Sequence, residues 1–394
     1  MSGAALLRHL PEPTPHVTER LRMFSAILSG QAASRRDLSD QFALRSTSVS
    51  EHVGHLVAVG LVVESLRHSS GRGRPSAVLV ANPHRLAAIV YQVESQAIAV
   101  SCVNLAGQVL ARIAREVPPE ADNHLMRDLL ASLFAAVSAR LPDPTEIAGV
   151  SFSLSGVLDA ARRRWLFSSR WPNLRAFDAA EAVSAAGLPV YVARNLDLEL
   201  SARLAHTSDV SGGTLLVHWG WGIGAAYAVD GMPVNGAEGR FGEIGHWRVV
   251  DRGGPCRCGR HGCLETVAAH WALSPRLAER WQVKANEEQA AAAVLRDLDL
   301  LAEPAFAEAL DAMVIAVGNL CRVLFPRRII VSGPFIDNAR VWSSFRERLA
   351  REGGMPGVAP PEVTADQRSR ELEREGAAAA PLRAGLQRLL NQGM

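Results

Sequence analysis

Apolar residues near the N-terminus recur every three or four positions, which is the spacing that one buried face of a helix requires. Leu21, Phe24 and Leu28 follow this pattern. A proline precedes them and a glycine follows them, as is usual at the two ends of a helix. The pattern predicts a first helix from about Thr14-Pro15 to Gly30.

Two further helices are predicted directly after the first. The segment Ser34-Arg35-Arg36-Asp37 has the spacing of a capping box, in which a side chain and the backbone at a helix start satisfy each other's hydrogen bonds. Ser46 is predicted to cap a third helix, which carries Val49 and Leu56 on one face and stops at Gly60. Three short helices joined by tight turns form a tri-helical unit.

The period of the apolar pattern then shortens to that of strands. Leu61–Leu66 and Ala77–Val80 are predicted to be two short strands, joined by a basic and glycine-rich loop from His68 to Ser76. Three helices followed by a hairpin are typical of a winged helix-turn-helix. Pro83 begins a new region, so we assign residues 1–82 to this unit.

From Leu86 onward, predicted strands alternate with predicted helices, which indicates α/β layers with ligands at the strand ends. The predicted strands are Ile98–Val103, Ile147–Leu154, Val190–Ala193, Leu215–Val217 and Arg328–Ser332, and the predicted helices include Asn123–Arg140 and Asp178–Ala186. The proline-rich segment Pro356–Asp366 is expected to be a surface loop before a helix that ends near Leu390.

Composition favours an ordinary globular chain of several domains. Of the 394 residues, 48% are hydrophobic and 21% are charged, and no apolar run reaches the roughly 18 residues of a membrane helix. Without a visible secretory signal, we expect a cytoplasmic protein. The net charge is only +2, but residues 1–82 contain nine arginines against six acidic residues, a weak indication of nucleic-acid binding.

Cysteine spacing changes the picture more than charge does. Cys256, Cys258 and Cys263 fall within eight residues, ten and more positions after His246. Three thiolates and one imidazole saturate a tetrahedral zinc ion, so such a site is structural and not catalytic. His261 competes with His246 for the fourth position, and three unrelated free cysteines are the alternative without metal.

The segment from Gly242 to His246, followed by Cys256-x-Cys258-Gly259-x-x-Gly262-Cys263-Leu264-Glu265, resembles the signature of the ROK family of repressors and sugar kinases. The resemblance implies a winged helix ahead of a two-lobed, actin-like and ribonuclease-H-like α/β sensor. It also implies zinc on His246, Cys256, Cys258 and Cys263, and a homodimer or homotetramer. We assign the first lobe to residues 83–195, completed by the C-terminal helix 376–394, and the second lobe with the zinc loop to residues 196–375.

Two motifs of the family's kinases are altered here. The stretch matching the kinases' Asp-x-Gly-Gly-Thr phosphate loop is Gln92-Val93-Glu94-Ser95-Gln96, which places a negative charge where phosphates bind. The position of the catalytic aspartate holds Leu196, with Asp197 one residue late. A glycine turn survives as Gly220-Trp221-Gly222-Ile223-Gly224. We therefore expect no enzymatic activity.

The third predicted helix would be the recognition helix, with polar side chains available to a DNA major groove. Arg72-Gly73-Arg74-Pro75 resembles the wing of ROK repressors and the core of an AT-hook, whose arginines enter a narrow A·T-rich minor groove. Predicted partners are therefore an inverted-repeat operator with A·T-rich stretches. The predicted DNA contacts are Arg45, Ser46, Thr47, Ser48, Ser50, His52, Arg72 and Arg74, with Glu51 and His55 on the same exposed face.

Polar residues that match the family's sugar contacts are Asn173, Asn195, Glu243, His246 and Glu265. Glu243 and Glu265 are alternatively partners that brace the zinc-binding histidine. The sequence thus predicts a transcriptional repressor of carbohydrate-related genes with a non-catalytic sugar sensor. A ROK sugar kinase that uses ATP, and a regulator whose sensor binds another protein, are the two alternatives.

Overall fold

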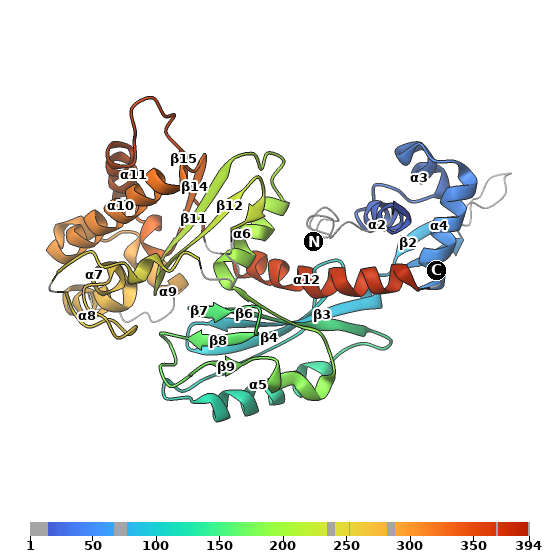
Figure 1. The fold of residues 1–394 in the computed structure, drawn as a ribbon, viewed down its shortest axis with the longest axis horizontal. Coiled ribbons are helices and arrows are strands. Elements are labelled where there is room, and N and C mark those ends of the chain that lie inside the picture. The colour runs from blue at the N-terminus through green and yellow to red at the C-terminus, as the bar shows by residue number, and fades with distance from the viewer. Residues whose placement is uncertain are drawn as a thin grey trace.

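The computed structural model describes residues 15–66, 77–234, 241–251, 253–281, 288–367 and 369–392. They form a small helical unit at one end and two α/β lobes, linked by one long C-terminal helix (Figure 1). This two-lobed mixed α/β architecture behind N-terminal helices confirms the predicted fold class.

The N-terminal unit consists of three helices and a hairpin. They are α2 (Pro15–Leu28), α3 (Arg35–Phe42), α4 (Ser46–Ala58), β1 (Val62–Leu66) and β2 (Ala77–Ala81), the two strands being antiparallel. Residues 67–76, which include the predicted DNA contacts Arg72 and Arg74, lie outside the described residues.

Two helix starts in this unit differ in their capping. At α3 the Ser34 hydroxyl accepts a hydrogen bond from the Asp37 N–H, and the Asp37 carboxylate accepts one from the Ala33 N–H at 2.9 Å, so the capping box is confirmed. The predicted cap at Ser46 is wrong. Ser46 is already helical, and Arg45 occupies the cap position with no side-chain hydrogen bond to the described backbone.

The first lobe is built on a five-stranded sheet in the order β10-β6-β3-β4-β5. β6 pairs in parallel with β10 and β3, whereas β3, β4 and β5 are antiparallel. Helix α5 covers one face of the sheet. The members of the lobe are η1 (Pro83–Arg85), β3 (Leu86–Glu94), β4 (Ala97–Asn104), β5 (Val109–Glu116), α5 (Asn123–Ser138), β6 (Glu146–Leu154) and β10 (Val190–Arg194).

A three-stranded sheet lies beside the first and contains β7 (Val157–Asp159), β8 (Arg164–Phe167) and β9 (Phe177–Asp178). The helix predicted over Asp178–Ala186 is wrong. Asp178 ends β9, and η2 (Glu181–Ala186) is a 3₁₀ segment interrupted at Val183. The segment is rich in alanine, but hydrogen bonds at its start hold it in turns: the Ala179 N–H donates to the Arg163 carbonyl, and the Asp178 carboxylate accepts from the N–H groups of Ala180 and Glu181.

The second lobe carries the sheet β13-β12-β11-β14-β15, in which β11, β14 and β15 run parallel. Its core packs the fully buried rings of Trp219, Phe306, Phe335 and Phe345. The members are β11 (Gly213–Trp219), β12 (Ile223–Val229), β13 (Met232–Pro233), η3 (Ile244–His246), α7 (Leu264–Ala268), α8 (His270–Trp281), α9 (Glu288–Leu295), η4 (Leu300–Ala302), α10 (Pro304–Leu324), β14 (Arg328–Ser332), η5 (Pro334–Asp337), α11 (Ala339–Glu352) and β15 (Glu362–Ala365).

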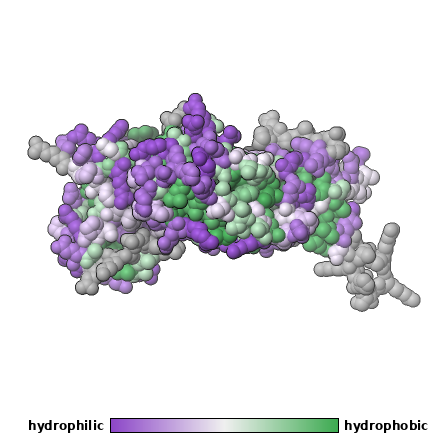
Figure 2. All heavy atoms as spheres, turned by 90° about the horizontal axis from the view of Figure 1, so that it is seen from below, coloured by the Kyte–Doolittle hydropathy of each residue, from purple (hydrophilic) through white to green (hydrophobic). Residues whose placement is uncertain are grey.

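The segment expected to be only a loop, Pro356–Asp366, contains β15 at the edge of this sheet. Its short length and its exposed residues explain why no strand was predicted. Seen from below, hydrophilic residues cover much of the surface, and hydrophobic residues gather in the middle of the view and toward its right-hand end (Figure 2). Among the described helices, none combines the length and the apolar character that crossing a membrane requires.

Helix α12 (Arg370–Asn391) connects all three parts. It packs on α6 (Asn195–Ala205) and on β6 and β3. Two glycines allow this close approach, because a Cβ at Gly376 would clash with the Leu198 carbonyl and one at Gly385 would lie 2.7 Å from Ala148 Cβ.

The last turns of α12 then pack against α2, and their leucines share one hydrophobic core with the N-terminal helices. The Arg20 guanidinium on α2 donates a buried hydrogen bond of 3.0 Å to the Leu390 carbonyl. The N-terminal unit is thus packed against the C-terminal end of the chain.

Candidate functional site

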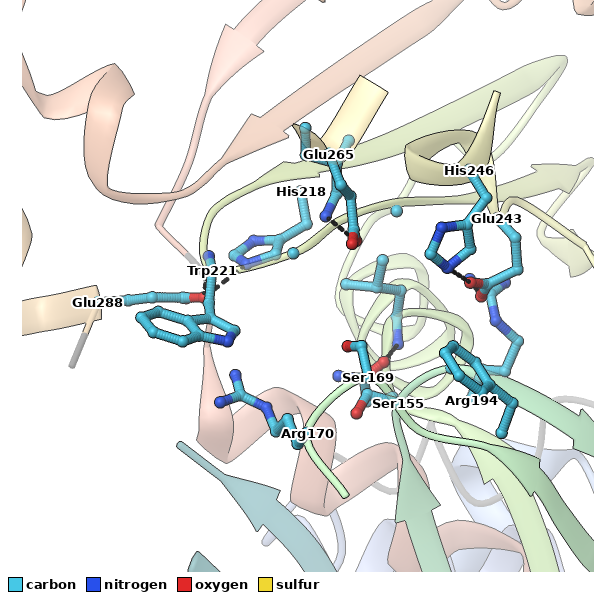
Figure 3. Close-up of a pocket in the computed structure, with 17 residues that line it drawn as sticks. Ser155, Ser169, Arg170, Arg194, His218, Trp221, Glu243, His246, Glu265 and Glu288 are labelled. Atoms are coloured by element: carbon cyan, nitrogen blue, oxygen red, sulfur yellow. Dashed lines mark hydrogen bonds and ion pairs between the residues drawn. The ribbon is translucent and has the colours of Figure 1, made fainter. Parts of the chain in front are cut away.

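A pocket lies between the lobes, where the ends of β10, β11 and β12 meet α6 and η3 (Figure 3). Carboxylates, arginines, histidines and one tryptophan surround it. The lining residues are Ser155, Gly156, Phe167, Ser169, Arg170, Arg194, Asn195, Leu196, His218, Trp221, Gly222, Ile223, Gly224, Glu243, His246, Glu265 and Glu288.

Leu196, and not an acidic residue, faces this pocket from the first turn of α6. Asn195 precedes it, and its side-chain oxygen accepts a hydrogen bond from the Leu196 N–H at 2.9 Å. Asp197 is 5% exposed and is not among the lining residues. No described carboxylate therefore occupies the position that the sequence comparison assigned to a base, because one residue along a helix turns a side chain by about 100°.

The buried Arg194 guanidinium organises the polar groups behind Leu196. It lies 3.4 Å from an Asp197 carboxylate oxygen and 3.1 Å from a Glu243 oxygen, and it donates to the Ala225 carbonyl at 3.2 Å. Burial raises the pKa of Asp197 to about 6, although the nearby Arg194 charge opposes the shift. Asp197 thus serves the structure of the lobe interface and does not reach the pocket.

Two carboxylates from other segments of the chain accept hydrogen bonds from the backbone of the glycine turn Gly220–Gly224. Glu288 accepts a hydrogen bond from the Trp221 N–H at 2.8 Å and lies 3.1 Å from His218 Nε2. Glu265 accepts one from the Ile223 N–H at 3.0 Å. Backbone N–H groups of glycine turns are frequent anion sites, and in this turn the anions are protein side chains.

The other nitrogen of His218, Nδ1, lies 3.0 Å from the Ser332 hydroxyl. Ser332 is completely buried on β14, so this hydroxyl positions the imidazole and cannot reach a ligand. Trp221 extends along the pocket edge, with the Arg170 guanidinium 5.7 Å from its ring centroid (Figure 3). An aromatic face beside polar groups is an arrangement suited to a ring-shaped, hydroxylated ligand.

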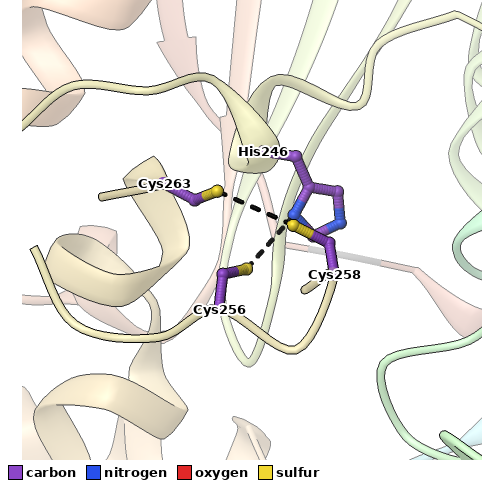
Figure 4. A group of neighbouring side chains, drawn as sticks. All are labelled: His246, Cys256, Cys258 and Cys263. Atoms are coloured by element: carbon purple, nitrogen blue, oxygen red, sulfur yellow. Dashed lines mark hydrogen bonds between the residues drawn. The ribbon is translucent and has the colours of Figure 1, made fainter. Parts of the chain in front are cut away.

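His246, Cys256, Cys258 and Cys263 converge beside the pocket, with all four donor atoms within 4.8 Å of one another (Figure 4). The Cys256 sulfur lies 3.5 Å from His246 Nδ1, and the Cys258 and Cys263 sulfurs are 3.7 Å apart. A tetrahedral zinc ion with Zn–S bonds of about 2.3 Å has ligand-to-ligand edges of about 3.7 Å. The four residues therefore fit a metal ion such as zinc.

The competing ligand His261 is exposed and does not belong to this group among the described residues. His246 Nε2 points instead toward Glu243, whose carboxylate oxygen is 3.9 Å away. One imidazole thereby joins the metal site to the pocket, because Nδ1 faces the thiols and Nε2 faces the pocket.

Of the five predicted sugar contacts, Asn195, Glu243, His246 and Glu265 line the pocket. Asn173 does not, because its amide donates to the Glu120 carbonyl at 2.9 Å. Five further polar or aromatic residues line the pocket, and the sequence predicted no ligand contact for them. Trp221 lies in the glycine turn already identified, and the other four come from separate segments without a shared motif. They are Arg170, Arg194, His218, Trp221 and Glu288.

A second cavity of the interlobe region borders the segment expected to replace the phosphate loop. Val93 and Ser95 line it, together with Arg370 at the start of α12. Glu94 is largely buried and forms ion pairs with Arg112 and, at 2.9 Å, with Arg370. The negative charge predicted at this position is thus neutralised by arginines and helps to hold α12.

Helix α4 presents part of the predicted DNA face. Arg45, Ser46, Thr47 and Ser50 are exposed, Ser48 is half-buried, and Glu51 is exposed. The exposure predicted for His52 is wrong, since this residue is 3% exposed and hydrogen-bonds through Nε2 to the Glu19 carboxylate at 2.9 Å. His55 is likewise half-buried, against the backbone of Leu389 and Leu390. Both histidines face the packed side of the helix.

A family model described as the ROK family matches residues 93–378. A glucokinase of Halalkalibacterium halodurans is 32% identical over 162 residues, which cover 37% of this chain and 49% of the relative. The DNA-binding transcriptional dual regulator NagC of Escherichia coli strain K12 is 25% identical over 250 residues, covering 62% of this chain and 60% of the regulator. The matched segments thus span about half to three fifths of these two relatives.

Among solved structures, a ROK family transcriptional regulator described as a homolog of the Escherichia coli MLC protein is similar over 95% of this chain and 98% of its own. The TM-score is 0.73 and the sequence identity is 22%. At this identity the similarity concerns the fold, and it includes the N-terminal helices as well as both lobes.

Proposed function

The chain belongs to the ROK family, and we propose on this basis that it is a DNA-binding transcriptional repressor of carbohydrate-related genes whose lobes bind a sugar without phosphorylating it. The observation that carries this proposal is the N-terminal unit of three helices and a hairpin packed onto the two ROK lobes. Such a unit has an evident use in a regulator and none in sugar phosphorylation.

The pocket supports binding more than catalysis. A kinase needs a carboxylate base and open backbone amides for the transferred phosphoryl group. Here Leu196 stands at the position of the base, and the Glu288 carboxylate accepts the Trp221 N–H. Asn195, Glu243 and Glu265 remain as groups that can exchange hydrogen bonds with vicinal hydroxyls.

We assign the reader to residues 1–82, the first lobe to residues 83–195 together with residues 376–394, and the second lobe to residues 196–375. His246, Cys256, Cys258 and Cys263 hold structural zinc in this proposal. The metal would cross-link η3 to the loop before α7. The three cysteines and the metal would thereby keep the His246 imidazole directed at Glu243.

DNA is contacted through the exposed start of α4, by Arg45, Ser46, Thr47, Ser48 and Ser50, and through Arg72 and Arg74. A homodimer or homotetramer would place two readers on an inverted repeat, because two-fold symmetry of the protein imposes the same symmetry on its site. A·T-rich stretches of the repeat would receive the two wing arginines.

The test begins with the selection of double-stranded DNA ligands by the purified, zinc-loaded chain. Fluorescence anisotropy then measures the affinity of the selected site for wild type and for Arg45→Ala, with Arg115→Ala on the exposed edge strand β5 as the charge-matched control. We expect Arg45→Ala to lower affinity by about 10-fold, in line with the loss of one charged contact, and Arg115→Ala to leave it unchanged. Failure to select any DNA, or equal loss in both variants, contradicts the proposal.

Sugar sensing is tested by calorimetric titration with monosaccharides, amino sugars and their phosphates, using wild type and Glu243→Gln. A sugar that binds the wild type is expected to weaken operator binding 5- to 150-fold, for about 1–3 kcal/mol of coupling. ATP consumption in the presence of that sugar supports the kinase alternative. Binding of no sugar, with DNA binding intact, favours the alternative in which the lobes bind a protein.

A further inference from the structure

A second cluster of metal-ligating side chains lies in the N-terminal unit, far from the cysteine cluster. His16 and Glu19 occupy successive turns of α2, and His52 comes from α4, the helix with the exposed polar start. One donor atom from each of the three residues lies within 4.8 Å of the other two. The two helices are neighbours in the fold (Figure 1), so the cluster spans a helix-helix contact.

The distances approach those of a chelate. A tetrahedral metal ion with bonds of about 2.0–2.1 Å to nitrogen and oxygen has ligand-to-ligand edges of about 3.3 Å. His52 Nε2 and the Glu19 carboxylate oxygen are already 2.9 Å apart. The His16 and His52 rings are tilted to each other, with centroids 5.9 Å apart. One ring nitrogen of His16 lies within 4.8 Å of a donor atom of each of the other two residues, and His16 is exposed, so packing does not fix its side chain.

Packing and a hydrogen bond hold the buried ligand, His52, in place without a metal ion. His52 is 3% exposed, and its Nδ1 has no hydrogen-bond partner among the residues that the structure describes. To donate to Glu19, the imidazole carries its proton on Nε2. A metal ion would take the place of that proton, between the same two atoms, without moving the ring from its packed position.

We propose that His16, Glu19 and His52 bind a divalent transition-metal ion. Two imidazoles and one carboxylate form a donor set suited to Zn²⁺, Ni²⁺ or Co²⁺, and unlike the cysteine cluster it offers no thiolate. Three protein ligands leave the fourth position of a tetrahedral ion open to water. The ion ties α2 to α4 and thereby fixes the orientation of α4, whose first turn carries Ser46 and Thr47.

The experiment uses the full chain with one equivalent of zinc already bound and adds Co²⁺ under anaerobic conditions. Visible absorption of Co²⁺ reports its ligands, because a thiolate site gives strong sulfur-to-metal charge transfer and a histidine-carboxylate site does not. We expect a second equivalent of metal that gives ligand-field bands without the thiolate transition. Elemental analysis of the dialysed complex supplies the stoichiometry.

Two variants assign the site. His16→Ala removes an exposed ligand without disturbing the core, and Glu19→Gln keeps an oxygen that accepts from His52 while it removes the charge. Removing a residue that only hydrogen-bonds to a metal ligand typically lowers metal affinity 10- to 100-fold. Each variant here removes a proposed direct ligand or its charge, so we expect it to weaken binding of the second Co²⁺ equivalent by at least about 10-fold. His84→Ala, an exposed histidine in η1 outside both clusters, serves as the control.

The proposal is overturned if the wild type takes up only one equivalent of metal, which would leave the His52–Glu19 contact as a hydrogen bond between two helices. It is equally overturned if the second equivalent binds His16→Ala and Glu19→Gln as tightly as the wild type. None of these outcomes depends on whether the chain binds DNA or a sugar.

Discussion

At the scale of single residues, Glu288 has the most direct consequence for the pocket. Its carboxylate accepts a hydrogen bond from the Trp221 N–H and lies beside His218. The contact with the turn is close, because a Cβ added at Gly220 would be only 2.6 Å from a carboxylate oxygen of Glu288. An anionic ligand approaching this turn therefore meets a negative charge instead of open N–H groups. Removal of this side chain should uncover an anion site.

Glu288→Ala is accordingly expected to gain affinity for inorganic phosphate. Phosphate should raise the melting temperature of this variant by a few degrees at about 100 times its dissociation constant, through mass action, and should leave the wild type nearly unchanged. Thermal-shift titration measures the difference. Glu308→Ala, which removes an exposed glutamate of α10, is the control. An identical response in all three proteins contradicts this role of Glu288.

Asp197 makes stability depend on pH in an unusual direction. Its pKa in the folded protein, about 6, lies above the ordinary value of 3.8 because the carboxyl is buried. Between these two values the folded chain binds more protons than the unfolded chain, so the contribution of Asp197 to stability falls as the pH rises. Asp197→Asn has no proton to lose.

The stability of Asp197→Asn relative to wild type should therefore increase by about 1 kcal/mol from pH 5 to pH 7, as expected for incomplete titration of one group. Urea unfolding of both proteins at the two pH values measures this change. Asp128→Asn, on the exposed surface of α5, should show no such trend. A pH-independent difference for Asp197→Asn means that its pKa is not raised.

The sequence predicted individual site residues only where they belong to a recognisable motif. The cysteine cluster and the pocket positions of Asn195, Glu243 and Glu265 follow from one contiguous signature and one strand end. Glu288 was not predictable, because it reaches the turn from a helix 67 positions away along the chain. His52 was predicted to be exposed but is buried. Exposed and packed side chains lie only a few positions apart along a helix, so a small error in the assumed orientation of α4 places a residue on the wrong face.

At the scale of elements, we expect the cysteine loop, residues 253–263, to depend on a bound metal more than on its own packing. Residues 253–263 form no helix or strand among the described residues. Isolated bridges such as Arg248 with Cys263 and Pro255 with His261, turns, and the contacts of Arg257 with the Ser169 carbonyl and the Trp271 ring hold this loop. Burial raises the pKa of the Cys256 thiol to about 12, which disfavours a free thiolate in this loop. A bound cation would compensate that charge and hold the loop closed.

Cys258→Ser should therefore reduce zinc below one equivalent at the cysteine cluster and lower the melting temperature by several degrees, because metal binding is coupled to folding of the loop. Elemental analysis and calorimetry measure the two effects. Cys321→Ala, a buried cysteine of α10 outside the cluster, should keep the metal. Full zinc content in Cys258→Ser would remove Cys258 from the ligand set.

Elements with strong periodicity were predictable and irregular ones were not. The ends of α2 and α3 follow from proline, glycine and a capping box, and the strands β6 and β14 from short segments rich in apolar residues. The segment 178–186 has apolar residues at helical intervals but is only two short turns long, so its contacts with neighbouring strands decide its conformation.

At the scale of the whole molecule, α12 is the element that makes three parts into one body. Its first turn holds Glu94 at the second cavity, and its last turns pack with α2. The hydrogen bond from Arg20 to Leu390 joins residues 370 positions apart. A contact between residues so far apart leaves no local sequence pattern, so the packing of the N-terminal unit on the C-terminal helix was not predicted.

Leu386→Ala tests whether this shared core supports the N-terminal unit. Leu386 is fully buried near the end of α12, and loss of a buried leucine side chain usually costs about 2–5 kcal/mol. Faster hydrogen exchange is expected in α2 and α4. Leu349→Ala, a comparable deletion in α11 of the second lobe, should leave exchange in α2 and α4 unchanged. Equal protection of both helices in the two variants contradicts the shared core.

The same core limits how this chain can be recombined with its relatives. A cassette cut after the hairpin would carry α2 and α4 but leave behind the leucines of α12 that complete their interior. Its apolar face would be open to water in the donor fragment and mismatched in the recipient. An exchange of DNA specificity between relatives therefore has to transfer the N-terminal helices and the final turns of the chain together, as one inherited unit made from both termini.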